Sequence, residues 1–132
     1  ALVKVLHEYH PDRILIEPSG VGKLSDVVRA VKGVGEEHLE ISSLVTVVDA
    51  GKCRMYLKNF GEFFGDQIAH AGAIVLSHTG KLSAEKVDAA VALCRAQLYS
   101  WLGLEDLQGA ELLESWEAER AEPESTPIVF AP

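Results

Sequence analysis

The chain has 132 residues, of which 48% are hydrophobic and 24% charged, and its net charge is −8 at pH 7. These values are typical of one globular domain with a single hydrophobic core. The negative charge argues against general nucleic-acid binding, which needs a basic surface, and no apolar run approaches the roughly 18 residues of a membrane span. Cys53 and Cys94 are far apart and form no Cys-x-x-Cys pair, so we expect reduced thiols and a cytoplasmic setting.

The first apolar segments predict a helix and then a strand. Residues 1–10 have apolar residues at helical spacing, and Pro11 stops the helix. The run Arg13–Glu17 has no polar interruption between its ends, which predicts a strand buried on both faces, and Pro18 ends it. We therefore expect the Glu17 carboxylate at the carboxyl end of a parallel strand, the edge of an open α/β sheet where ligands bind.

The loop that follows imitates a phosphate-binding loop without matching one. The Walker-A pattern needs a Gly separated by four residues from the Gly-Lys pair, and a Ser or Thr directly after the Lys. Around Gly22 and Lys23, these two places hold Glu17 and Leu24. We expect Ser25 or Asp26 to cap the next helix instead.

Strands and helices alternate through the rest of the chain. A broken helix, or two short ones, is expected after the second strand because Gly61 and Gly65 interrupt its pattern. A long helix that Ser83 caps is expected after the third strand. The further strands are predicted at Leu44–Val48, which closes on Asp49, at Ala73–Leu76 and at Pro127–Phe130. This alternation predicts an α/β fold, a three-layer sandwich with a mostly parallel sheet and right-handed crossovers.

An acidic segment interrupts the pattern before the last strand. Between Glu105 and Glu124 there are eight acidic residues and one basic residue, Arg120. We expect residues 1–132 to be a single domain with an acidic helical or irregular insertion at about 103–125. A docking surface for a basic partner is the alternative interpretation of this segment.

Three segments, in order, resemble the CobW-type P-loop GTPases. Asp12–Gly20 resembles the Walker-B region of that family: an apolar strand, Glu, any residue, Ser or Thr, then Gly. Val47–Ala50 is similar to its V-V-D-A strand end, and Asp66–Leu76 is similar to its D-Q-I-x-x-A-D-x-I-V-L segment. Together the matches cover roughly positions 12 to 82.

The resemblance implies roles for the residues after the first strand. Glu17 matches the Walker-B carboxylate, a catalytic group that acts on Mg²⁺ through a bound water or orients the attacking nucleophile. Ser19 matches the family's Ser or Thr, and Gly20 matches the Gly whose N–H approaches the γ-phosphate. The chain thus resembles part of a P-loop NTPase domain, with GTP and Mg²⁺ as its implied ligands.

The base-binding motif departs from the family. The guanine-reading Asn-Lys-x-Asp aligns with Ser77, His78, Thr79 and Gly80. Gly80 has no carboxylate to accept from the guanine ring, and Ser77 has a hydroxyl where Asn has an amide. His78 can still stack where the Lys stem packs. Guanine specificity is therefore an open question at the sequence level.

The resemblance implies a GTP-hydrolysing metal chaperone or insertase that handles zinc, cobalt or a related ion for a metal-requiring client protein. The family's phosphate-binding loop and its Cys-x-Cys-Cys motif for the transported metal are expected upstream of Ala1, so these residues alone are expected to be inactive. The alternative is a nucleotide-independent interaction module, which the altered base motif and the acidic segment favour. A Rossmann-type domain is disfavoured because no G-x-G-x-x-G follows a strand. Unpaired strand edges also predict self-association.

Overall fold

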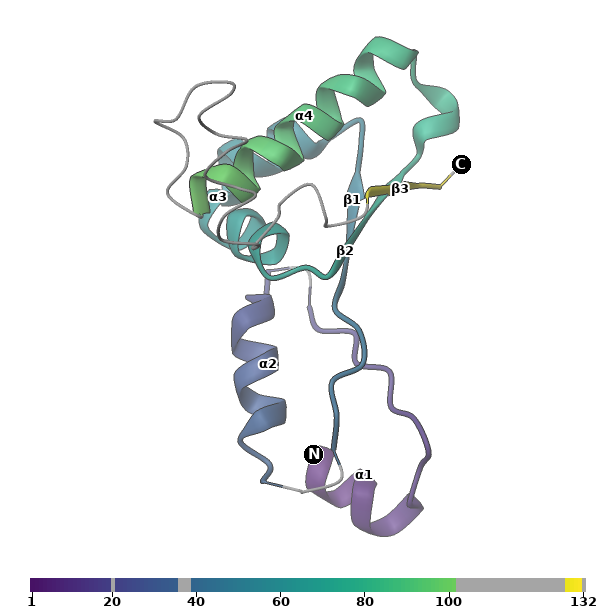
Figure 1. Cartoon of the computed structure of the whole chain (residues 1–132), viewed down its shortest axis with the longest axis vertical. Coiled ribbons are helices and arrows are strands. Elements are labelled where there is room, and N and C mark those ends of the chain that lie inside the picture. Colours follow the sequence, from purple (N-terminus) through teal and green to yellow (C-terminus); the bar gives the residue numbers. More distant parts are fainter. Residues whose placement is uncertain (20, 36–38, 102–127, 132) are drawn as a thin grey trace, which may run out of the picture.

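The computed structural model describes residues 1–19, 21–35, 39–101 and 128–131 (Figure 1). The acidic segment predicted at about 103–125 lies outside these residues. The elements follow in the order α1 (Leu2–Tyr9), α2 (Leu24–Lys32), β1 (Val45–Asp49), α3 (Cys53–Ala69), β2 (Ala73–Ser77), the 3₁₀ helix η1 (Thr79–Lys81), α4 (Ala84–Trp101) and β3 (Ile128–Phe130).

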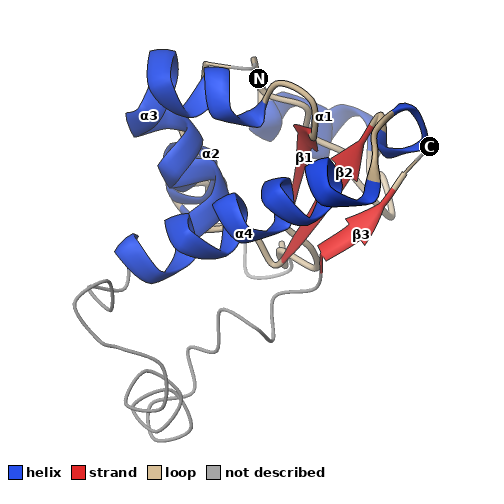
Figure 2. Ribbon diagram, turned by 90° about the horizontal axis from the view of Figure 1, so that it is seen from above, coloured by secondary structure: helices blue, strands red, loops and turns tan. Residues whose placement is uncertain are grey.

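The three strands form a parallel sheet in the order β1-β2-β3 (Figure 2). Val45 is paired with Ala73 and Asp49 with Ser77, so β1 and β2 end together at the carboxyl edge. The helix between them is a parallel crossover, as the alternating pattern predicted. This confirms the α/β class and the parallel sheet.

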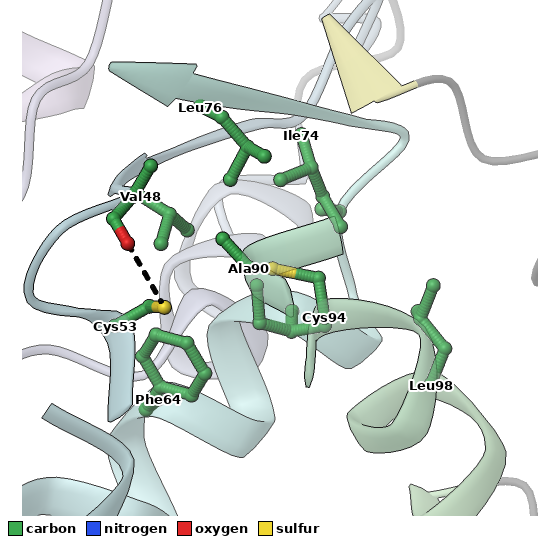
Figure 3. Close-up of a cluster of buried hydrophobic side chains, with 11 residues drawn as sticks. Val48, Cys53, Phe64, Ile74, Leu76, Ala90, Cys94 and Leu98 are labelled. Atoms are coloured by element: carbon green, nitrogen blue, oxygen red, sulfur yellow. Dashed lines mark hydrogen bonds between the residues drawn. The ribbon is translucent and has the colours of Figure 1, made fainter. Parts of the chain in front are cut away.

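The core lies between the sheet and helices α3 and α4. Alternate residues of the strands face these helices: Val48 is 4% exposed, and Ile74 and Leu76 are fully buried. The buried side chains labelled in Figure 3 are Val48, Cys53, Phe64, Ile74, Leu76, Ala90, Cys94 and Leu98. The opposite face of the sheet is open, because Val45 is 50% and Val47 66% exposed. The described residues therefore supply the sheet and one helical layer.

Both cysteines are free thiols inside this core. Burial raises the pKa of Cys94 to about 12, with a contribution from the nearby Cys53, and burial also raises the pKa of Cys53. A protonated, buried thiol is a poor nucleophile and a poor metal ligand. These cysteines therefore serve as small core residues.

Helix α3 is broken where the glycine pattern predicted an interruption. Phe60, the residue before Gly61, has φ −135° and ψ 38°, outside the helical region. Two helical parts meet at this kink, which confirms the predicted interruption near Gly61. The break divides α3 into a first part that follows β1 and a last part that leads into β2.

The predicted strand Arg13–Glu17 is wrong. Residues 11–19 contain no helix or strand, and Leu15 is 92% exposed and Ile16 49% exposed. An apolar run becomes a strand only where a neighbouring backbone accepts and donates its hydrogen bonds. In this structure no described strand pairs with this segment, although β1 pairs only with β2 among the described strands and its other edge is open.

Helices α1 and α2 and the segment that leads into β1 form the lower part of the molecule in Figure 1. The start of α2 contacts α3, and the Leu44 carbonyl accepts from the N–H groups of Gly72 (2.8 Å) and Ala73 (3.1 Å). Among the helices of the described residues, none is long and apolar enough to cross a membrane.

Candidate functional site

The loop between Glu17 and α2 is held by the last part of α3. Gln67 Nε2 donates to the Gly22 carbonyl (2.7 Å), and Lys23 Nζ donates to Glu62 Oε1. The hydroxyl of Ser25 donates to Asp66 Oδ2 (2.7 Å), and its N–H donates to Asp66 Oδ1 (3.0 Å). We call this set, which joins Gly22, Lys23 and Ser25 to Glu62, Asp66 and Gln67, the loop–α3 contacts.

The predicted cap of α2 is corrected by these contacts. The helix begins at Leu24 with Lys23 in the capping position, and neither Ser25 nor Asp26 caps it with a side chain. The acceptor for a free N–H of the first turn is instead Asp66, 41 residues further along the chain. The prediction failed because a cap from a distant element leaves no local pattern.

Asp66 and Lys23, two charged residues of the loop–α3 contacts, have hydrogen-bonding partners that shift their pKa values. Burial by itself raises the pKa of Asp66, which is only 3% exposed, but hydrogen bonds from Ser25 and the charge of His70 outweigh it. The pKa of Asp66 therefore lies below its ordinary value of 3.8. The hydrogen bond to Glu62 raises the pKa of Lys23, so the lysine stays protonated and held by that carboxylate. Lys23 is thus not presented to a phosphate in this structure, in keeping with the missing Walker-A pattern.

Glu17 and Ser19 are exposed in the segment before this loop, and Gly20 lies outside the described residues. No other described side chain is paired with the Glu17 carboxylate. Carboxylate and hydroxyl oxygens are hard ligands that Mg²⁺ prefers, and this ion is commonly held by one or two carboxylates together with phosphate oxygens. The donor chemistry of Glu17 and Ser19 therefore fits a Mg²⁺–nucleotide complex.

The predicted base-binding residues lie at the carboxyl ends of β1 and β2. The Ser77 hydroxyl donates to the Val48 carbonyl (3.3 Å), and His78 Nδ1 lies 3.4 Å from Asp49 Oδ2. Thr79 Oγ1 donates to the Ala131 carbonyl (2.7 Å) after β3. His78, with a left-handed φ of 60°, and Gly80 are exposed, whereas Ser77 and Thr79 are partly buried.

Ser77, His78 and Asp49 resemble a serine–histidine–aspartate arrangement but lack its geometry. The Ser77 hydroxyl lies 3.3 Å from His78 Nδ1, the same ring nitrogen that faces Asp49. A relay needs the serine on one ring nitrogen and the carboxylate on the other. This group can bind a ligand through the imidazole face, but it cannot activate the hydroxyl of Ser77 as a nucleophile.

The structure does not bring the two predicted groups together. Gln67 holds the loop beside the amino end of the sheet, where its own carbonyl accepts from Thr46 Oγ1 (2.7 Å) near the start of β1. Ser77 lies at the opposite, carboxyl end of β2. Glu17 follows no strand in this structure, so the expectation that it lies at the carboxyl end of a parallel strand is wrong. Its physical reason is the missing strand, since a segment outside the sheet is not delivered to that edge.

A family comparison decides what kind of domain this is. The model of the CobW/HypB/UreG nucleotide-binding domain matches residues 1–99, three quarters of the chain. The chain belongs to the CobW/HypB/UreG family. The comparisons with curated proteins and with solved structures gave no match.

The CobW/HypB/UreG match includes both groups of predicted residues, from Glu17 to Gly80, and the loop–α3 contacts. It confirms the resemblance seen in the three sequence segments and identifies the chain with a nucleotide-binding domain. Within the described part of the chain, no group of three or more His, Cys, Asp or Glu residues is placed to hold a metal ion.

Sequence reasoning missed the residues that fix the loop. Asp66 and Gln67 belong to the D-Q-I segment, which gives them no role in holding the loop, and Glu62 belongs to no motif. Two adjacent polar residues in an otherwise apolar helix end were a signal, because a buried carboxylate needs hydrogen-bond donors. The sequence could not say that those donors come from Gly22 to Ser25.

Proposed function

We propose that this CobW/HypB/UreG domain is part of a GTP-hydrolysing metal chaperone or insertase that delivers zinc, cobalt or a related ion to a client protein. In this proposal Glu17, Ser19 and Gly20 act on the γ-phosphate side. Ser77, His78, Thr79 and Gly80 lie on the base side. The observation that carries the proposal is the family match across both groups, joined to a Glu17 carboxylate that is exposed.

Each residue has a defined task in this proposal. Glu17 orients the attacking water or holds a water of the metal shell, and Ser19 donates or accepts at the phosphate. His78 stacks against the base. Gly80 has no side chain, so the base has no carboxylate partner at this position. Mg²⁺, when bound, neutralises charge that develops on the phosphate oxygens.

A nucleotide-independent interaction module is the second candidate. Two observations favour it: Lys23 is paired with Glu62, and Gly80 stands where the family has an acid that reads guanine. In that case the exposed valine face of the sheet, at Val45 and Val47, is the surface for a partner. The two candidates differ in whether Glu17 affects turnover.

The test is Glu17→Gln in the full-length protein. We expect nucleotide binding to be retained and the kcat for GTP hydrolysis to fall by about 10²-fold or more, because a positioned proton-transfer or electrostatic group is lost. Asp12→Asn, an exposed acid five residues earlier, is the matched control and should leave kcat unchanged. Equal turnover in Glu17→Gln and the wild type would support the interaction module instead.

A further inference from the structure

The segment that follows β2 lacks the acid that reads guanine but has two hydroxyl side chains that could bind a base instead. The family's Asp aligns with Gly80, and Ser77 and Thr79 lie on either side of His78. Guanine differs from adenine at one edge, where the O6 atom of guanine accepts a hydrogen bond and the amino group of adenine donates one. A site therefore distinguishes the two bases only if a free donor or acceptor reaches that edge.

Neither hydroxyl is free to donate to a base. The Ser77 hydroxyl donates to the Val48 carbonyl (3.3 Å), and Thr79 Oγ1 donates to the Ala131 carbonyl (2.7 Å). A hydroxyl has a single proton, so both donors are used inside the protein. The two residues are also partly buried, with their oxygens directed at the backbone of β1 and at the residue after β3.

The carboxylate of Asp49, at the end of β1, is also engaged within the protein. Its Oδ1 accepts from the Gly51 N–H (2.9 Å), and its Oδ2 lies 3.4 Å from His78 Nδ1 and 3.9 Å from Lys52 Nζ. The Asp49 side chain is only 22% exposed. Asp49 therefore does not replace the acid that is missing at Gly80.

Of the four residues from Ser77 to Gly80, His78 is the one whose side chain is open to a base, because it is 61% exposed. Its Nδ1 lies 3.3 Å from Ser77 Oγ and 3.4 Å from Asp49 Oδ2. Since Ser77 gives its proton to Val48, both neighbours of Nδ1 act as acceptors, and Nδ1 carries the hydrogen. The ring is thus held at one edge by Asp49 and Ser77, and most of it is left for stacking.

Stacking on an aromatic ring holds a base without identifying it, because every base has a π-face. We propose that this domain binds purine nucleoside triphosphates without selecting guanine over adenine, so that ATP is a substrate as well as GTP. His78 is the stacking residue, Asp49 is a positioning residue that orients its ring, and Gly80 is the cause of the lost selectivity. This inference rests on the proposed function, because it names the substrate class of the same site.

The experiment measures the dissociation constants of non-hydrolysable GTP and ATP analogues, each with Mg²⁺, by calorimetric titration of the full-length protein. We expect the two values to agree within about threefold, which is less than an average hydrogen bond contributes. The reason is that no side chain from Ser77 to Gly80 offers a free hydrogen-bonding group to the edge at which the two bases differ.

Gly80→Asp tests the cause of the lost selectivity. Gly80 lies in η1, and among the described glycines only Gly35 has a positive φ, so the backbone at Gly80 accepts a side chain. The new carboxylate should raise the preference for guanine about tenfold or more, because a hydrogen bond to a charged group is worth a factor of about 13 or more. Lys81→Asp adds the same group one residue later at an exposed position, and this matched control should leave the ratio unchanged.

His78→Asn tests the stacking separately. His78 has a left-handed φ of 60°, a conformation that Asn adopts more readily than most residues, so this variant keeps the backbone and removes the ring. We expect both dissociation constants to rise about fivefold or more, because the stacking of the base is lost. The ratio between them should stay the same.

The outcomes separate this inference from the proposed function. A difference of more than about threefold between the two analogues in the wild type would overturn the inference and leave the proposed function in place. Unchanged affinities in His78→Asn, or an unchanged ratio in Gly80→Asp, would also overturn it. Equal binding of both analogues, together with unchanged turnover in Glu17→Gln, would support the inference and count against the proposed function. Binding of neither analogue would overturn both.

Discussion

Two apolar runs of this chain have similar sequences and different structures. Leu44–Val48 becomes strand β1, paired with β2 and buried on alternate residues. Ile14–Ile16 stays extended, unpaired and exposed. The difference is the neighbour: β1 has a parallel strand and helix α3 against it, whereas no described strand pairs with the earlier run. Hydrophobicity makes a segment able to enter a sheet, and only a partner's backbone makes it a strand.

The largest expected effect on stability comes from truncating a buried side chain of the sheet, and it contrasts with truncation of an exposed side chain in the first run. Ile74→Ala, at a fully buried position, should lower the free energy of unfolding by about 2–5 kcal/mol, because it removes core contacts and leaves a cavity. Leu15→Ala should change it by less than about 0.5 kcal/mol. Urea unfolding of both variants measures the two values.

If Leu15→Ala lowered the free energy of unfolding by about 2 kcal/mol or more, the exposure of Leu15 in this structure would be contradicted. It would mean that the first run is buried in solution. A small loss in Ile74→Ala would contradict the core described between the sheet and α3.

The next largest expected effect on stability concerns Asp66, the buried carboxylate that joins the start of α2 to α3. A carboxyl group whose folded pKa is lowered stabilises the fold above its unfolded pKa, and this stabilisation is lost as the pH falls through the folded value. We expect the contribution of Asp66 to be complete at pH 7 and to decrease below about its ordinary pKa of 3.8. Asp66→Asn should therefore cost about 1–3 kcal/mol at pH 7 and less at pH 3, as a hydrogen bond to a charged group does.

Unfolding curves at pH 7 and pH 3 compare wild type and Asp66→Asn directly. Other carboxyl groups titrate in both proteins, so the difference between them isolates Asp66. If the difference in stability between wild type and Asp66→Asn were larger at pH 3 than at pH 7, this prediction would be contradicted.

The smallest effect belongs to the exposed pair Lys23 and Glu62. The Glu62 side chain is 72% exposed, and exposed ion pairs add little because water and salt screen them. Glu62→Gln should shift the thermal midpoint by no more than about 2 °C. A clearly larger shift in a thermal scan would show that this pair, and not Asp66, holds the loop.

The sequence predicts features that depend on neighbouring residues better than features that depend on residues far apart in the chain. The helix that Pro11 ends, strands β1 and β2 and the interruption near Gly61 have local patterns, and each was predicted close to its place. The cap of α2 was missed because its acceptor, Asp66, is 41 residues away. The position of Glu17 was missed for a related reason, because it depends on a strand pairing that no local pattern encodes.

The sequence predicted which residues form the candidate site but not where they lie relative to one another. Three ordered segments were enough to indicate the family, and the match over residues 1–99 confirms it. That the loop before α2 lies near the amino end of the sheet follows from the loop–α3 contacts, which no sequence pattern indicates.

The most direct test of the account is amide hydrogen exchange in the full-length protein, with GDP and with a non-hydrolysable GTP analogue, both with Mg²⁺. We predict that the analogue slows exchange in residues 17–25 and 77–81 together, because one nucleotide then contacts both groups. GDP should slow exchange only in the second range, because it lacks the γ-phosphate. Exchange in residues 17–25 that is the same with both nucleotides would contradict the assignment of Glu17 to the γ-phosphate.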